Sequence, residues 1–179
     1  LAGVSSQGIT LDDMNADGYV DIVSFGVAPL STQGGFGCFL GDGAGGFTAA
    51  EGQGTGWAPV AIATGDIDCD GARDVIACLG DQGGAVAYLG DGSGSSFVLG
   101  NIVQPASGYA GNVELADLNL DGVDDLLLES SYISSSGLSA ALGFGNGAFQ
   151  GLATFAGGGG PGLPYVADMD GDGDLDVLF

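Results

Sequence analysis

The sequence predicts an all-β fold, a β-propeller-type array of four-stranded antiparallel blades with about three and a half repeats. Three observations predict it: an aspartate-rich motif that returns along the chain, short β-prone runs on both sides of each copy, and glycine-rich hairpin turns between the copies. Four strands in a unit of about 50 residues correspond to one propeller blade. No stretch shows sustained apolar periodicity of the helical kind, so we expect negligible helix.

The repeated motif is nine residues long and occurs four times without gaps. Its copies are DMNADGYVD from Asp13, DIDCDGARD from Asp66, DLNLDGVDD from Asp117 and DMDGDGDLD from Asp168. Their starts lie 53, 51 and 51 residues apart. A β-prone run follows each copy, and others precede it, such as VAIATG before Asp66. The pattern predicts a hairpin in which each copy connects two strands.

A second element lies between the copies. The stretches CFLGDGAGGF (38–47), AYLGDGSGSSF (87–97) and ALGFGNGAF (141–149) share a strand, a glycine-rich turn and a phenylalanine. Asp-Gly and Asn-Gly supply the residues with positive φ that tight hairpin turns require. Because Phe47, Phe97 and Phe149 recur at one position of the repeat, we expect them to pack between neighbouring blades.

We expect a single repeat domain over residues 1–179. Residues 1–7 are predicted to be the end of a preceding strand, blades 1 to 3 to span 8–59, 60–111 and 112–164, and 165–179 to form half a blade. An exposed two-stranded edge invites pairing with another chain. Two interpretations stay open: self-association through the half-blade edge into a dimer or head-to-tail polymer, or a piece of a longer propeller.

Charge excludes several function classes. The 179 residues carry 23 acidic side chains against one basic residue, Arg73, for a net charge of −22. Such a surface repels nucleic acid and anionic membranes, because binding phosphates requires Lys and Arg. The apolar runs are too short to insert into a bilayer. With no histidine, a single arginine and no nucleophile motif, the chain is not expected to be an enzyme.

Each motif copy is a candidate Ca²⁺ loop. Positions 1, 3, 5 and 9 carry side-chain oxygens and position 6 is always glycine. Hard oxygen ligands in this number suit Ca²⁺, whereas Mg²⁺ demands stricter geometry and keeps more waters. We expect the backbone carbonyl of position 7 to be a further ligand, and the position 9 carboxylate to be able to bind through both oxygens. The chain is expected to bind up to four ions, and four Ca²⁺ change its net charge from −22 to −14. The predicted ligands are Asp13, Asn15, Asp17, Tyr19 and Asp21 in loop 1 (13–21); Asp66, Asp68, Asp70, Ala72 and Asp74 in loop 2 (66–74); Asp117, Asn119, Asp121, Val123 and Asp125 in loop 3 (117–125); and Asp168, Asp170, Asp172, Asp174 and Asp176 in loop 4 (168–176).

The EF-hand and plain acidic turns are the competing interpretations. An EF-hand needs a glutamate at position 12 and flanking helices. Position 12 is instead Ser24, Ala77, Leu128 and Phe179 in the four copies, so none of them is an EF-hand loop. One acidic turn is an ordinary soluble connection, but four copies in one register favour metal binding.

The motif D-x-[DN]-x-D-G-x-x-D, followed by a strand and then LGDG and phenylalanine, resembles the FG-GAP/VCBS repeats of integrin α-subunit propellers and of many secreted microbial proteins. The resemblance covers nearly the whole chain. It implies an extracellular or cell-surface propeller, stabilised by calcium, that serves adhesion, recognition or assembly. Family propellers usually have seven blades, about twice the number that this sequence accommodates.

These expectations leave two candidate functions, each with its own kind of partner. The first is a structural or adhesive module that binds protein partners; the alternative is a carbohydrate-binding, lectin-like propeller. The Ca²⁺ loops and the GDG turns are expected at one end of the blades, and more variable loops at the other, where Trp57 and Tyr132 are candidate contact residues. Ordinary packing is the competing interpretation for both rings. The serine cluster 130–136 is either a plain loop or a carrier of O-linked sugars.

Three cysteines allow at most one internal disulfide. A Cys69–Cys78 bridge across the hairpin is geometrically conceivable, and free buried thiols are equally ordinary for Cys38, Cys69 and Cys78.

Overall fold

The computed structural model describes residues 5–27, 34–82, 84–104, 109–132, 135–151, 153–156 and 165–178. Every regular element in these ranges is a β-strand, which confirms the all-β prediction. Residues 157–164 and the side chain of Tyr132 lie outside what is described. Across the described ranges there is no helix with the length and apolar character that crossing a membrane requires.

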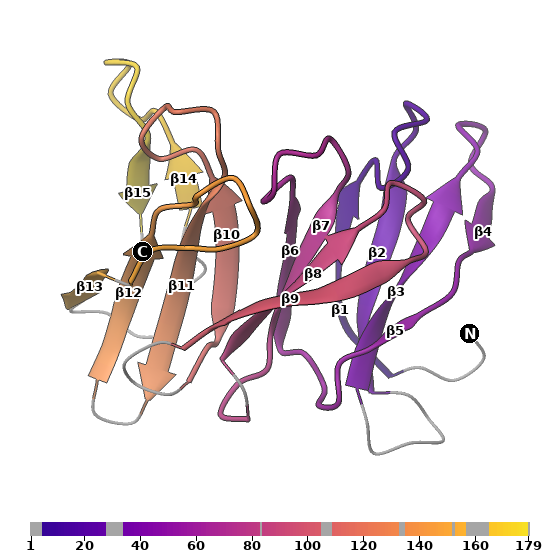
Figure 1. Ribbon diagram of the computed structural model, residues 1–179, viewed down its shortest axis with the longest axis horizontal. Helices are drawn as coiled ribbons and strands as arrows, with labels where there is room; N and C mark the ends of the chain where they lie inside the picture. The colour runs from indigo at the N-terminus through magenta and orange to yellow at the C-terminus, as the bar shows by residue number, and fades with distance from the viewer. Residues whose placement is uncertain are drawn as a thin grey trace.

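The strands form four antiparallel sheets in chain order (Figure 1). Blade 1 consists of β1 (Ser5–Asp12), β2 (Asp21–Val27), β3 (Gly34–Gly41), β4 (Phe47–Ala49) and β5 (Gln53–Gly54). Blade 2 consists of β6 (Ala61–Gly65), β7 (Asp74–Cys78), β8 (Ala85–Gly90) and β9 (Phe97–Val103). Blade 3 consists of β10 (Asn112–Ala116), β11 (Asp125–Tyr132), β12 (Ser135–Ala141) and β13 (Ala153–Ala156). The two-stranded sheet pairs β14 (Tyr165–Ala167) with β15 (Asp176–Leu178).

The first hairpin of each sheet has the same register. The residue before each motif pairs with its position 9: Asp12 with Asp21, Gly65 with Asp74, Ala116 with Asp125 and Ala167 with Asp176. Side chains therefore have equivalent orientations at equivalent positions of the four repeats, because a one-residue slip would reverse every one of them. This shared register allows one repeat to be compared with another, residue by residue.

Blade 1 differs from the prediction at both of its ends. The assignment of residues 1–7 to a preceding strand is wrong for residues 5–7, because Ser5 and Ser6 pair with Val27 and Gly26 as part of β1. A register shift between Ser6 and Gly8 separates this pairing from the rest of the hairpin, which made the extension hard to recognise. The outer strand is divided, since β4 and β5 both pair with β3.

The core lies between blades. Val23, Phe25 and Phe36 of blade 1 pack against Val75 and other residues of blade 2 in one buried cluster. A second cluster packs blade 2 on blade 3. We call the face of a blade that contacts the blade before it in the chain its preceding face, and the opposite one its following face. Packing of stacked sheets through their faces is the arrangement expected of a propeller-like array.

The motif loops and the GDG turns lie at the same end of the blades, the upper end in Figure 1, as expected from the alternation of turns in an antiparallel sheet. A backbone hydrogen bond from Gly147 N to Ile67 O, 3.0 Å long, joins the turn of blade 3 to the motif loop of blade 2. The chain thus gathers its acidic loops at one end of the molecule.

Candidate metal centres

The four motif loops share an unusual backbone. Position 6 has positive φ in every copy, from 86° at Gly18 to 97° at Gly173. Position 4 also has positive φ, although it is glycine only in loop 4; Ala16, Cys69 and Leu120 have φ values of 55°, 60° and 59°. Non-glycine residues rarely adopt this region, and its cost must be offset by the surrounding structure. Two left-handed residues per loop give four copies of one tight turn.

The aspartate at position 1 holds this turn together. One of its oxygens accepts a hydrogen bond from the N–H of the position 6 glycine in all four loops, at 2.8–3.1 Å. In loops 1 to 3 the other oxygen accepts from the position 5 N–H, at 2.9–3.1 Å. Loop 4 differs, since the second donor there is the N–H of Gly171 at position 4. The carboxylate is therefore directed into the loop before any ligand is considered.

Positions 3 and 5 are oriented by the same kind of short-range bond. The position 3 side chain accepts the position 5 N–H, and the position 5 carboxylate accepts the position 7 N–H at 2.7–2.9 Å. In two loops the side-chain oxygens come close enough to share one cation: ligand atoms of Asp66, Asp68 and Asp74 lie within 4.8 Å of one another, as do those of Asp168, Asp170 and Asp172. In loops 1 and 3 the Asn15 and Asn119 amides donate to the position 5 carboxylate at 3.0 Å.

Position 9 has a structural role that the sequence did not reveal. Asp21, Asp74 and Asp125 are fully buried. One oxygen of each accepts the N–H of position 2, as does that of Asp176 in loop 4, and the other accepts the N–H of the glycine that begins the GDG turn, at 2.7–2.8 Å. Each carboxylate oxygen keeps a lone pair after accepting one bond. Position 9 therefore fastens the motif loop to the turn of the same blade.

Position 7 reinforces the same connection by packing. A Cβ built on Gly43 would lie 2.2 Å from the Tyr19 ring, and one built on Gly145 would lie 3.4 Å from Val123. The glycine of the turn is needed at Gly43 for this close approach, because any side chain there would collide with the ring. The role of the position 7 backbone carbonyls as calcium ligands remains a prediction.

Burial, together with neighbouring carboxylates, raises two pKa values in loop 2. Burial raises the pKa of Asp74 to about 6, against the hydrogen bonds from Gly90 and Ile67 that lower it. Burial and the neighbouring charge of Asp70 raise the pKa of Asp68. Both effects disfavour the ionised form, so these sites gain from a bound cation. The donor set of each loop, carboxylate and amide oxygens only, fits Ca²⁺.

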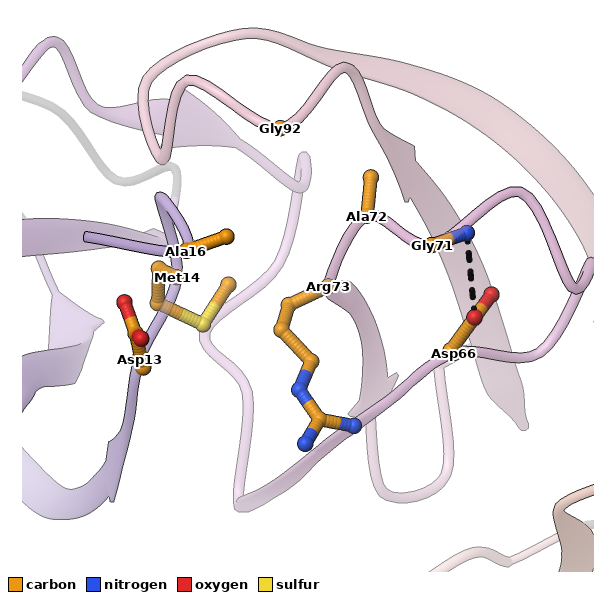
Figure 2. Close-up of a pocket in the computed structure, with 8 residues that line it drawn as sticks. All are labelled: Asp13, Met14, Ala16, Asp66, Gly71, Ala72, Arg73 and Gly92. Carbon is orange, nitrogen blue, oxygen red and sulfur yellow. Dashed lines mark hydrogen bonds between the residues drawn. The ribbon is translucent and has the colours of Figure 1, made fainter. Parts of the chain in front are cut away.

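A hollow of about 360 Å³ lies between loops 1 and 2. Figure 2 shows Asp13 and Met14 on one side of it, Asp66 on the other, and the Arg73 side chain between them. The Arg73 guanidinium forms an ion pair with Asp12, with Nε 3.3 Å from Oδ1. Position 8 of loop 2 thus contacts the blade before it. In blade 3, Asp124 at the same position accepts a hydrogen bond from Asp66 N at 3.2 Å.

The remaining sequence predictions have mixed outcomes. Phe97 and Phe149 pack between blades as expected, Phe97 with its ring centroid 5.1 Å from that of Phe36. For Phe47 the prediction is wrong, because this ring is half exposed on the preceding face of blade 1. Trp57 is exposed.

All three cysteines are free, so the Cys69–Cys78 bridge is not formed. Cys78 is buried in the interface between blades 2 and 3, whereas Cys69 at position 4 of loop 2 is exposed. Burial raises the pKa of Cys38 to about 11 and that of Cys78 to about 12, and an adjacent carboxylate adds to each shift.

Comparison with known proteins agrees with the geometry. Residues 13–77 match the FG-GAP-like repeat family. That stretch contains loops 1 and 2 with the strands between them, and the match confirms the expected FG-GAP resemblance there. No curated protein matches the sequence.

Among solved structures, the chain is similar to an Agrocybe aegerita lectin whose structure was described for its specific recognition of non-reducing terminal N-acetylglucosamine. The TM-score is 0.63 at 23% sequence identity, and the match covers 94% of this chain but only 45% of the lectin chain. This likeness supports an all-β, propeller-like fold. The chain spans less than half of the length of that lectin.

Proposed function

We propose that the chain is a calcium-stabilised, extracellular or cell-surface β-propeller module with a structural or adhesive role. It acts through protein contacts, either by self-association, in which the edge of the β14–β15 sheet takes part, or within a larger propeller. Up to four Ca²⁺ ions occupy loops 1 to 4. The enzyme class has no support, since the carboxylates are the chemically versatile groups and most of them lie in the loops.

The observation that carries this proposal is the repetition of one preorganised loop. Four separate segments adopt the same two left-handed positions and direct the position 1 carboxylate onto the position 6 N–H. A soluble turn has no need of three or four carboxylates and amides at fixed spacing. Unpaired, these groups repel one another, and a divalent cation at each loop converts that repulsion into attraction.

Calcium is proposed to act on folding more than on chemistry. Ion binding to the native loops and not to the unfolded chain stabilises by about 2.7 kcal/mol per site when free Ca²⁺ is 100 times Kd. Position 9 transmits this stabilisation, because it joins the loop to the GDG turn of its own blade. The turn of blade 3 in turn contacts the motif loop of blade 2. A metal in one loop therefore supports the interface between two blades.

Calcium titration of single-loop variants tests the proposal. We expect isothermal calorimetry to give up to four bound ions for the unaltered chain, and one fewer after Asp70→Asn, because that substitution removes the charged position 5 ligand that all four loops have. Asp91→Asn is the matched control. Asp91 is an exposed aspartate of the neighbouring GDG turn, where its carboxylate accepts the Ser93 N–H, and it is not a proposed ligand. An unchanged stoichiometry after Asp70→Asn, or an equal loss after Asp91→Asn, would contradict the assignment.

Carbohydrate binding is the second candidate, and two observations favour it. The fold is similar to that of a lectin, and the hollow between loops 1 and 2 is lined by the polar groups Asp13, Asp66 and Arg73 next to the apolar Met14. Carboxylate and guanidinium groups beside apolar surface suit a sugar, whose hydroxyls both donate and accept. A glycan array in saturating Ca²⁺ tests this function. Hits that disappear after Arg73→Ala support it, and an array without hits contradicts it.

A further inference from the structure

Position 8 of a motif loop contacts the start of the loop in the blade before it, at the interface of blades 1 and 2 and at that of blades 2 and 3. In blade 2 this residue is Arg73, whose Nε lies 3.3 Å from Oδ1 of Asp12, the residue before loop 1. In blade 3 it is Asp124, whose Oδ2 accepts the backbone N–H of Asp66, position 1 of loop 2, at 3.2 Å. The second contact joins two proposed calcium loops directly.

Both contacts serve the same backbone group, the N–H of position 1. In loop 1 this N–H, that of Asp13, donates at 2.9 Å to Oδ1 of Asp12, the oxygen that Arg73 holds. Loop 2 has Gly65 at the register position of Asp12, so its own blade offers no side chain there. A Cβ built on Gly65 would collide with the Asp124 carboxylate. The acceptor for loop 2 is therefore supplied by the next blade, in the space that Gly65 leaves.

Asp124 also lies between two proposed ligands of loop 3. Val123 precedes it and is a predicted ligand through its backbone carbonyl; Asp125 follows it and is fully buried. On the other side of the contact, Asp66 provides the position 1 carboxylate of loop 2, which accepts the N–H of Gly71 at 3.0 Å. One side chain thus connects the proposed ligand set of loop 3 with that of loop 2. Groups that hold a metal ligand in place commonly change metal affinity when they are removed.

We infer that Asp124 is a positioning residue that couples the calcium sites of loops 2 and 3: an occupied loop 3 orders residues 123–125, and Asp124 then holds the backbone of Asp66 for loop 2. The inference rests on the proposed calcium loops and adds their regulation, because the affinity of each site depends on the occupancy of the other. The sign of the coupling is diagnostic. Two bound cations repel each other, so charge alone makes neighbouring sites anticooperative, whereas the Asp124 contact makes them cooperative.

Calcium titrations of the 179-residue chain, followed by NMR of its ¹⁵N-labelled glycines, test the coupling. The position 6 N–H donates to the position 1 carboxylate, so the Gly71 and Gly122 amide signals report loops 2 and 3 separately. Asp121→Asn removes the position 5 carboxylate of loop 3, an exposed residue, and leaves loop 2 unaltered. We expect loop 2 of this variant to bind calcium more weakly, by about fivefold or more. Charge alone predicts the opposite, because loop 3 without its divalent ion is more negative even after losing one carboxylate.

Variants of Asp124 then locate the coupling. Asp124→Ala should weaken loop 2 by about tenfold or more. Adding Asp121→Asn to it should weaken loop 2 no further, because the connection is already lost. Asp124→Asn keeps an oxygen acceptor and should restore most of the affinity. Asp91→Ala removes an exposed carboxylate of the neighbouring turn and is the control for lost charge.

A metal-free measurement checks the contact itself. In EDTA, the Asp66 amide proton should exchange faster in Asp124→Ala than in the unaltered chain, since its acceptor is gone; unchanged circular dichroism confirms the fold. A loop 2 affinity that is equal or higher after Asp121→Asn, or additive effects of Asp121→Asn and Asp124→Ala, would overturn the coupling and leave the calcium proposal standing. Gly71 and Gly122 signals that do not respond to calcium would overturn both, so the two failures are distinguishable.

Discussion

The glycine at position 6 of each loop offers a perturbation whose cost follows from the backbone alone. At Gly71, φ is 87°, and a Cβ built there meets no atom within 4 Å. Gly71→Ala therefore adds no steric clash, and its effect is the strain of a left-handed residue, about 1–2 kcal/mol. For a chain of this length, that strain lowers the melting midpoint by roughly 2–8 °C.

The control for Gly71→Ala is Gly54→Ala. A Cβ on Gly54 also meets nothing within 4 Å, but its φ lies outside the left-handed region. We expect this substitution to be neutral or to stabilise by up to about 1 kcal/mol, because alanine restricts the unfolded chain. Thermal melts are recorded by circular dichroism in EDTA, so that metal binding does not contribute. Equal midpoints for the two variants would refute the proposed loop geometry.

Two other predictions follow from buried thiols and carboxylates. In the native protein, iodoacetamide should label one thiol of three, the exposed Cys69, and all three after unfolding; rapid native labelling of Cys38 or Cys78 would contradict their burial. In EDTA, the free energy of unfolding should rise as the pH falls from about 6 toward 4. The pKa of Asp74 is about 6 in the folded state and 3.8 in the unfolded chain, so the native state takes up the proton first. With calcium the trend should reverse, since protons compete with the ion for the Asp74 carboxylate. Identical pH profiles with and without calcium would contradict the assignment of Asp74 as a calcium ligand.

Much of the fold could be predicted because the motif repeats without gaps. Ungapped spacing sets the hairpin register, and it placed Asp21, Asp74, Asp125 and Asp176 at the starts of strands, where the structure has them. The glycine-rich turns were equally readable, since residues with positive φ leave a sequence signal. Local chemistry was therefore accessible from the sequence.

Features that depend on distant partners were not accessible. The bond between Asp21 and the N–H of Gly41 joins residues 20 positions apart, and nothing in either residue type indicates it. The left-handed conformation of Ala16 and Leu120 was equally hidden, because neither residue type favours it; Gly171 in loop 4 was the one available hint. Phe47 was misassigned because the repeat predicts an equivalent environment, while the exposure of a face depends on which blade lies beside it.

The most direct test of the calcium-stabilised module is the melting midpoint of the 179-residue chain in saturating Ca²⁺, in excess EDTA, and in EDTA with Mg²⁺ restored. For each loop occupied at 100 times Kd, the gain of about 2.7 kcal/mol corresponds to roughly 5–11 °C. We predict a midpoint in Ca²⁺ that is higher than in EDTA by at least that amount, with Mg²⁺ recovering only a small part of it. Coincident melts in Ca²⁺ and EDTA would contradict the assignment of the four loops as calcium sites.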